Sequence, residues 1–286
     1  MGFIIYSDKK IIENSNISNL ADTPNSIAYI TSQKEAFFSN KIPDINISRD
    51  IEIVDKNNLY LTIPYVQNGD KHKVEAILEK NRLLIYMKEE GFIEYLKEKL
   101  YLEEIISGKF ILLALFEYLS MSYHEGLIKM DEQLEDLFEE AVINDSIQME
   151  AILKNKKIVS LIKRYVNYYR SIINYLEDTF ESLPLYRRLY LTFENTLHIV
   201  EDVETSIYSC IEIYNSISGN KMNKTMQILT IITVFSLPLT IMTGIFGMNF
   251  SSMPLINNPY GFIISFVLVT IIIFLEIHIF KKKKFF

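Results

Sequence analysis

Only one cysteine, Cys210, occurs in this chain of 286 residues, which excludes an internal disulfide framework. A zinc site built mainly from cysteines is excluded for the same reason. Histidine is scarce as well, and the four histidines are scattered without the spacing of a metal-binding helix pair. They are His72, His124, His198 and His278. Because no P-loop or other catalytic constellation is present either, the sequence predicts a protein that is not an enzyme.

Charged side chains are absent from residues 225–275. A membrane-spanning helix needs about 20 apolar residues, so this stretch suits two crossings. Its middle is rich in residues that favour a tight connection. These residues are Gly247, Pro254, Asn257, Asn258, Pro259 and Gly261. The C-terminal fifth of the chain is therefore predicted to form a helical hairpin in a bilayer.

Acidic residues outnumber basic residues in the part of the chain before this hairpin. The chain carries −7, and the only formal charges after residue 224 are Glu276 and the four lysines at 281–284, so residues 1–224 carry −10. This excess of acids favours cations and argues against nucleic acid, whose phosphates require basic patches. The apolar stretch at 3–6 is too short for a signal peptide, so we expect the soluble part to stay in the cytosol.

The first 90 residues contain short segments rich in residues that favour strands, bounded by residues that favour turns. We expect strands at 3–6, 27–30, 51–54, 59–63, 74–78 and 83–86, with a hairpin turn at 79–82 and short helices within 9–20 and 33–40. From residue 91 the pattern becomes helical. Apolar periodicity marks 110–123, 129–142 and 146–180, and Leu134, Leu137, Phe138 and Val142 are expected on one side. The fold class is therefore an α/β domain with a helical second half.

Proline is absent from residues 185–237, and glycine occurs there once, at Gly219. We interpret this region as one helix of about 60 residues, near 90 Å long at about 1.5 Å per residue. A lone rod of this kind is unstable, so it must bundle with partners. Its apolar residues recur at threes and fours, as in a coiled-coil seam. They include Leu189, Leu197, Val200, Val203, Ile207, Ile211 and Tyr214.

The end of this helix carries a narrow uncharged stripe with spacings of three and four residues. Its members are Asn223, Met226, Thr230, Thr233, Leu237, Thr240 and Gly244. Threonine and glycine are common where membrane helices pack, so the stripe has an interpretation as a packing face. A second interpretation follows from a family resemblance.

The residues around Gly247-Met248-Asn249 resemble the signature of the CorA family of magnesium channels. The similarity includes Thr230, Thr233, Pro238 and Thr240, the segment 244–250, Met253-Pro254 and the closing lysines. The close match runs from about Leu185 to the C-terminus. Members usually have tyrosine before the triplet, where this chain has Phe246.

This resemblance implies a funnel-shaped homo-oligomer of five copies in the plasma membrane, with both termini in the cytosol. The stripe would line a central pore, with Met226 and Leu237 as hydrophobic constrictions. Mg²⁺ gives up its water reluctantly, so an uncharged pore would pass the hydrated ion. Gly247, Met248 and Asn249 would form the filter at the pore mouth, where the Asn249 carbonyl can accept from ion-bound water.

The sequence departs from the family at two places. Many members have acids just after the triplet, but this chain has Ser251-Ser252, so its outer loop concentrates cations weakly. Arg188 stands where relatives have an aspartate that helps to bind a regulatory Mg²⁺ between subunits. Glu201, Asp202 and Glu212 are the remaining candidates for regulatory metal binding. Glu276 is expected to reach toward the lysines that follow it.

We therefore expect five segments: an α/β domain at 1–184, a stalk continuing into the first span at 185–246, an outer loop at 247–259, the second span at 260–280 and a basic tail at 281–286. The expected cargo is Mg²⁺ or another divalent cation such as Co²⁺ or Ni²⁺. Two alternatives stay open. One is a zinc transporter of the same superfamily, and the other is a membrane-anchored scaffold or sensor.

Overall fold

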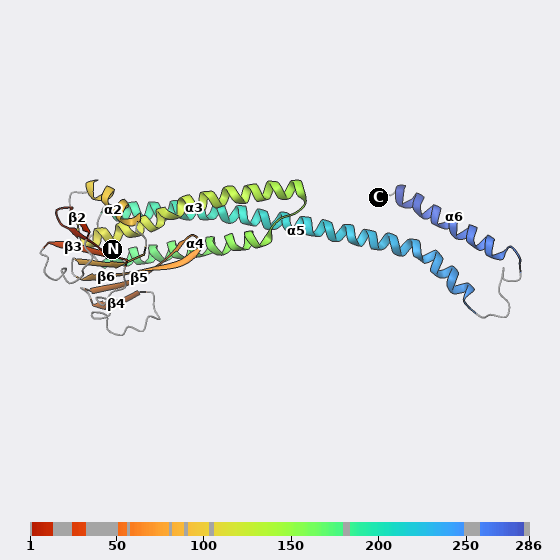
Figure 1. The fold of residues 1–286 in the computed structure, drawn as a ribbon, viewed down its shortest axis with the longest axis horizontal. Coiled ribbons are helices and arrows are strands. Elements are labelled where there is room, and N and C mark those ends of the chain that lie inside the picture. Colours follow the sequence, from red (N-terminus) through yellow and green to blue (C-terminus); the bar gives the residue numbers. More distant parts are fainter. Residues whose placement is uncertain are drawn as a thin grey trace. The chain divides into compact units, whose positions relative to one another are not determined.

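The computed structural model describes residues 2–13, 25–32, 51–55, 58–79, 82–88, 91–102, 106–179, 184–248 and 258–282. The chain divides into two compact units, Met1–Ile211 and Glu212–Phe286, and one helix passes from the first unit into the second (Figure 1).

In the described part of the first unit, seven strands form one mixed sheet with the order β2-β1-β3-β7-β6-β5-β4. The strands are β1 Gly2–Tyr6, β2 Ile11–Glu13, β3 Ser26–Thr31, β4 Ile51–Asp55, β5 Asn58–Gln67, β6 Asp70–Glu79 and β7 Arg82–Tyr86. Only β3 and β7 run parallel among the paired strands described. The predicted strands are confirmed. The helix expected within 9–20 is wrong for Ile11–Glu13, which instead pair with β1.

The hairpin of β5 and β6 is longer than the strands beside it. The two strands pair along their whole length, from the pair Asn58–Glu79 to the pair Gln67–Asp70. Strand β4 pairs with β5 only as far as Leu61. Beyond that point the backbone edge of β5 has no strand partner in the described residues. Proline lacks an N–H and is tolerated at such an edge, which explains how Pro64 can stand inside β5.

Three tyrosine hydroxyls from the helices occupy this free edge. Tyr168 donates to the Thr62 carbonyl at 3.4 Å, and Tyr169 donates to the Pro64 carbonyl at 2.5 Å. The Tyr123 hydroxyl accepts from the Val66 N–H at 3.3 Å. The tyrosines therefore satisfy backbone groups that would otherwise be buried without partners.

The helical layer consists of α2 Gly91–Leu102, α3 Gly108–Asn144, α4 Met149–Thr179 and the first part of α5 Pro184–Phe246 (Figure 1). Ser107 caps α3 by accepting from the Phe110 N–H at 3.2 Å, and Asp145 ends it in the left-handed conformation. Pro184 begins α5, where its missing N–H costs nothing. Against α3 and α4, one face of the sheet buries Leu61, Ile63 and their neighbours in the main core.

The seam predicted along α5 is buried within its own chain. Leu189, Val200, Val203 and Ile207 are almost completely buried in the same core as α3 and α4. The partners that this part of the rod requires are therefore two helices of the same chain. At the far end of α3 the expected apolar side is only partly buried, because Leu134 is covered while Phe138 and Val142 are exposed.

The second unit contains the rest of α5 and α6 Gly261–Lys282. Both helices are long and apolar enough to cross a membrane by length and composition. Pro238 stands inside α5, and beyond the adjoining part of α5 no described atom comes within 4 Å of the position where a Cβ on Gly219 would be. The segment expected as a helix within 33–40 lies outside the described residues.

Candidate functional site

The stripe predicted on α5 lies on one exposed side of the helix. Met226 and Leu237 are 54% and 56% exposed in the single chain, and the other five members are exposed as well. Such exposure of a mostly apolar helix suits a membrane or a further copy of the chain, not water.

The threonines of the stripe have their hydroxyl protons engaged inside the helix. Thr230, Thr233 and Thr240 each donate to the carbonyl four residues earlier, at 2.8, 2.9 and 2.8 Å. A hydroxyl has one proton and two lone pairs, so each oxygen presents acceptor capacity outward. A surface of acceptors without charge can receive hydrogen bonds from the water around a cation without replacing that water.

The side of α5 that faces α6 is a different one. Residues such as Val234, Pro238 and Met242 are half-buried, and each stands one or two positions from a stripe member. One position corresponds to about 100° around a helix of 3.6 residues per turn. Most of the stripe is therefore left uncovered by α6, although Leu237 also lines the groove between the two helices.

The helix ends at the glycine of the predicted filter. The Gly247 N–H donates to the Thr243 carbonyl at 2.9 Å, and the Met248 N–H donates to Ile245 at 3.2 Å. A Cβ at Gly247 would lie 3.1 Å from the Thr243 oxygen, closer than most such contacts. Glycine therefore allows the tight end of α5. Asn249, the third predicted filter residue, lies outside the described residues.

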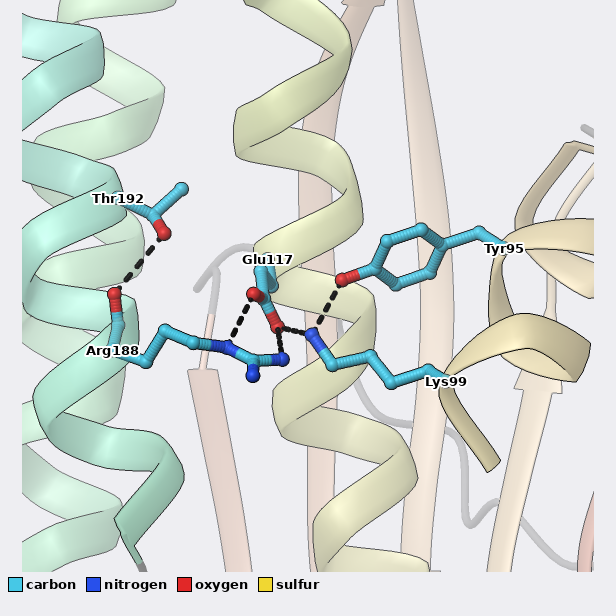
Figure 2. A network of polar contacts seen from close by, with 5 residues as sticks. All are labelled: Tyr95, Lys99, Glu117, Arg188 and Thr192. Carbon is cyan, nitrogen blue, oxygen red and sulfur yellow. Dashed lines mark hydrogen bonds and ion pairs between the residues drawn. The ribbon is translucent and has the colours of Figure 1, made fainter. Parts of the chain in front are cut away.

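Figure 2 shows a charged cluster that joins α2, α3 and α5 in the first unit. Arg188 donates to the two Glu117 oxygens, from Nε at 2.8 Å and from Nη2 at 3.4 Å. Lys99 also contacts Glu117 and donates to the Tyr95 hydroxyl at 2.6 Å. The side chains of Glu117 and Lys99 are 5% and 6% exposed, whereas Arg188 is 49% exposed.

One buried carboxylate thus balances two cations, and the cluster keeps a net positive charge at its exposed side. Burial raises the pKa of Tyr95 to about 12, so its hydroxyl stays protonated. Arg188, which replaces the aspartate of relatives, is thus bound within its own chain by two hydrogen bonds to Glu117.

The acids predicted to bind a regulatory metal do not converge. Glu201, Asp202 and Glu212 are each exposed, and Glu201 lies 3.9 Å from His198. Nearby, Glu204 accepts from Lys163 at 2.5 Å, which raises the pKa of Lys163. In the described part of the chain, no three histidine, cysteine or acidic side chains are grouped to hold a metal ion.

A second row of acids on α3 lines a cavity of about 400 Å³ next to α5. Glu135 and Glu139 face it together with Ser206 and Ser209, and Asp131 accepts from Ser206 at 2.6 Å.

A small polar cluster between α3 and α5 was not predicted. Thr196 donates to the Thr192 carbonyl at 2.8 Å, and its hydroxyl also forms hydrogen bonds with the Ser120 hydroxyl and with His124 Nε2, at 2.8 Å each. Burial lowers the pKa of His124. The sequence offered no signal for this contact, because its residues are more than 70 positions apart in sequence.

The sequence matches the family described as CorA-like Mg²⁺ transporter protein over residues 31–282. The cobalt/magnesium transport protein CorA of Thermotoga maritima is 30% identical over 233 residues, which cover 75% of this chain and 65% of that protein. This chain thus spans just under two thirds of that relative's length.

The protein of the same name from Methanocaldococcus jannaschii is 32% identical over 246 residues, covering 80% of this chain and 69% of its own. The solved structure of the complete CorA magnesium transporter from that organism matches with a TM-score of 0.68 and 21% identity, over 98% of this chain and 97% of the other. At that identity the structural likeness concerns the fold. Since the family match covers most of the sequence, the chain belongs to the family of CorA-like Mg²⁺ transporters.

Proposed function

We propose that this chain forms a channel that moves hydrated Mg²⁺, and in part Co²⁺ or Ni²⁺, into the cytosol. The observation that carries the proposal is the uncharged stripe on α5, most of which α6 leaves uncovered. Its threonine hydroxyls donate their protons to carbonyls of the same helix and so present acceptor oxygens outward. Membership of a transporter family supports it. The named relatives are transport proteins, and the proposed role is accordingly not enzymatic.

Several copies must surround an axis, because a single helix cannot enclose a path for ions. We propose five copies, with the stripe of each lining the pore and Met226 and Leu237 forming its narrow apolar rings. Such rings can close a pore by excluding water. No carboxylate lies on the stripe, so the ion keeps its first shell of water, which Mg²⁺ releases only reluctantly.

The filter in this proposal consists of Gly247, Met248 and Asn249 at the outer end of α5. The amide oxygens of several Asn249 residues would accept hydrogen bonds from ion-bound water. The driving force is the electrochemical gradient. Two positive charges crossing 100 mV correspond to about 4.6 kcal/mol, at roughly 2.3 kcal/mol per charge.

Placement in the plasma membrane with both termini in the cytosol completes the proposal. It is supported by the two apolar helices and the lysines at the end of α6. Labelling of a C-terminal tag in intact cells tests the orientation, since extracellular labelling would contradict it.

The function is tested by Mg²⁺ flux into liposomes that contain the purified protein. We expect Asn249→Ala to abolish flux while the oligomer stays intact, because Asn249 is the main polar group of the proposed filter at this uncharged mouth. Asn257→Ala, an asparagine of the same connection, is the matched control and should conduct. Flux of Zn²⁺ alone would favour the zinc transporter, and no flux of any cation in the wild type would favour a scaffold. Wild-type flux in Asn249→Ala would reject the filter.

A further inference from the structure

A groove of about 530 Å³ lies between α5 and α6 in the second unit. This volume is within the range of about 300–1,000 Å³ that ligand pockets commonly show. From α6, the groove is lined by residues at spacings of three and four, including Leu268, Ile272 and Glu276. From α5 it is lined by Leu237, Ile241 and other apolar residues. Glu276 is the only ionisable residue among those that line the groove.

Within the described part of the chain, the Glu276 carboxylate lacks a hydrogen-bond donor for one of its oxygens. Its Oε2 atom is shielded and has no hydrogen-bond partner among the described residues. The described contacts include no ion pair from Glu276 to Lys281 or Lys282, and the other two lysines of the tail lie outside the described residues. The side chain instead borders the groove.

A charge in this position is expensive without a partner. Acidic residues within membrane helices are rare and normally pair with another group. No other charged residue stands between Lys224 and Glu276 in the sequence. The facing part of α5 therefore cannot supply a cation, and no ion pair from α6 reaches Glu276 among the described contacts.

We propose that the groove binds a phospholipid with a primary amine headgroup. The acyl chain would lie along the apolar residues, and the ammonium would donate hydrogen bonds to the Glu276 carboxylate. Since no other ionisable residue lines the groove, the Glu276 carboxylate is the charge that selects the headgroup.

The choice of a primary amine follows from the acceptor. A carboxylate oxygen without a partner requires a hydrogen-bond donor, and an ammonium group provides three. A quaternary ammonium carries the same charge but no N–H, so it leaves Oε2 unsatisfied. The inference rests on the proposal that α5 and α6 span a bilayer, but not on ion conduction or on the orientation of the chain.

The experiment measures which lipids stay bound to the purified full-length protein. The protein is reconstituted in equal amounts of phosphatidylethanolamine and phosphatidylcholine with identical acyl chains, extracted with detergent, washed and analysed by mass spectrometry. We expect the wild type to retain phosphatidylethanolamine about tenfold over phosphatidylcholine, as a charge-assisted hydrogen bond allows. Glu276→Gln should remove this preference, and Ile272→Trp, which fills the groove, should reduce retention of both lipids.

Glu150→Gln, an exposed change at the start of α4, is the matched control and should retain lipid like the wild type. Equal retention of both lipids by the wild type would overturn the proposal, as would an unchanged preference in Glu276→Gln. A third outcome would assign the groove to another copy of the chain instead. In that case the wild type shows no lipid preference, and Glu276→Gln separates into smaller assemblies on gel filtration. Because lipid retention is measured without ion flux, a chain that fails to conduct can still pass this test.

Discussion

At the scale of single residues, Glu117 is the side chain on which the start of α5 depends most. It holds Arg188 from α5 and Lys99 from α2 at the same time (Figure 2). A buried ion pair adds little net stability when it forms, because desolvation opposes the attraction. Loss of one partner is different, since it leaves a buried charge without compensation.

We therefore expect Glu117→Gln to destabilise the protein by about 3–5 kcal/mol, because Lys99 stays buried without its counter-ion. The measurement is thermal unfolding followed by circular dichroism of the full chain in detergent. Glu125→Gln is the control, since Glu125 is exposed and solvent screens its ion pair with Lys129 on the same helix. Equal melting temperatures for the two variants would show that the cluster does not hold the helices together.

His124 predicts a pH dependence of stability. Its pKa in the folded protein is lowered by burial from the ordinary value of 6.5. Above that value both states are neutral at this residue, and stability is unaffected. As the pH falls below it, the unfolded chain takes up a proton that the folded chain resists, so stability decreases until the lowered folded pKa is passed.

Melting temperatures of the wild type and His124→Gln, recorded from pH 7.5 downward, test this. The glutamine amide can still form a hydrogen bond with Thr196 but does not titrate. We expect the wild type to lose more stability than the variant on acidification. Parallel curves would place the pH-sensitive group elsewhere.

At the scale of elements, the sequence predicted regular structure well and contacts poorly. Strands at 59–63 and 74–78 were visible because residues that favour strands are concentrated there between residues that favour turns. The structure extends both strands into a longer hairpin, β5 and β6. The extension could not be predicted, because Pro64 and the lysines near Asp70 are not typical of a paired strand. Tyrosines far along the chain provide the hydrogen bonds that the edge of the longer β5 needs.

The same limit applies to the candidate site. The stripe on α5 could be predicted because its members lie on one helix, and spacing alone places them on one side. The contact of Glu117 with Arg188 joins residues 71 positions apart, and the contact of Thr196 with His124 joins residues 72 apart. Packing of separate helices decides such contacts, and no local pattern encodes it.

Tyr169→Phe tests the role of the tyrosines at the edge of β5. Tyr169 is fully buried, and removal of its hydroxyl leaves the Pro64 carbonyl without that donor. We expect a loss of about 1–3 kcal/mol, the cost of an unsatisfied buried group. Tyr101→Phe, at a side chain that is 87% exposed, should change the melting temperature little. Faster hydrogen exchange in β5 of Tyr169→Phe, measured by mass spectrometry, would locate the effect, and unchanged exchange would argue against it.

At the scale of the whole molecule, regulation depends on what surrounds residue 188. The family resemblance implies an inhibitory Mg²⁺ site there, built with an aspartate. In this chain Arg188 supplies a fixed positive charge to Glu117 instead. Arginine holds such a carboxylate through two donors and does not lose its charge. We expect inhibition by internal Mg²⁺ to be correspondingly weak.

Arg188→Asp should reverse this, because it adds one carboxylate and releases Glu117 from the guanidinium. The internal Mg²⁺ concentration that halves flux should fall by about tenfold, equivalent to roughly 1.4 kcal/mol of added binding. Flux is recorded against internal Mg²⁺ in liposomes, with Arg187→Asp as the neighbouring charge-matched control. Combining Arg188→Asp with Glu117→Gln should cancel most of the shift. If the curves for residues 187 and 188 coincide, the sensor lies elsewhere.

Gly219 gives α5 a point of low torsional stiffness. It lies between the clamped start of the helix at Arg188 and the threonines that follow, and no neighbouring side chain braces it. Glycine in a helix interior weakens it by roughly 1 kcal/mol relative to alanine, because the backbone is freer there. A twist applied at one end of α5 is therefore absorbed in part at Gly219 before it reaches Thr230. Stiffening this point would transmit more of that rotation, and the mechanical coupling between the two ends of the helix would become stronger.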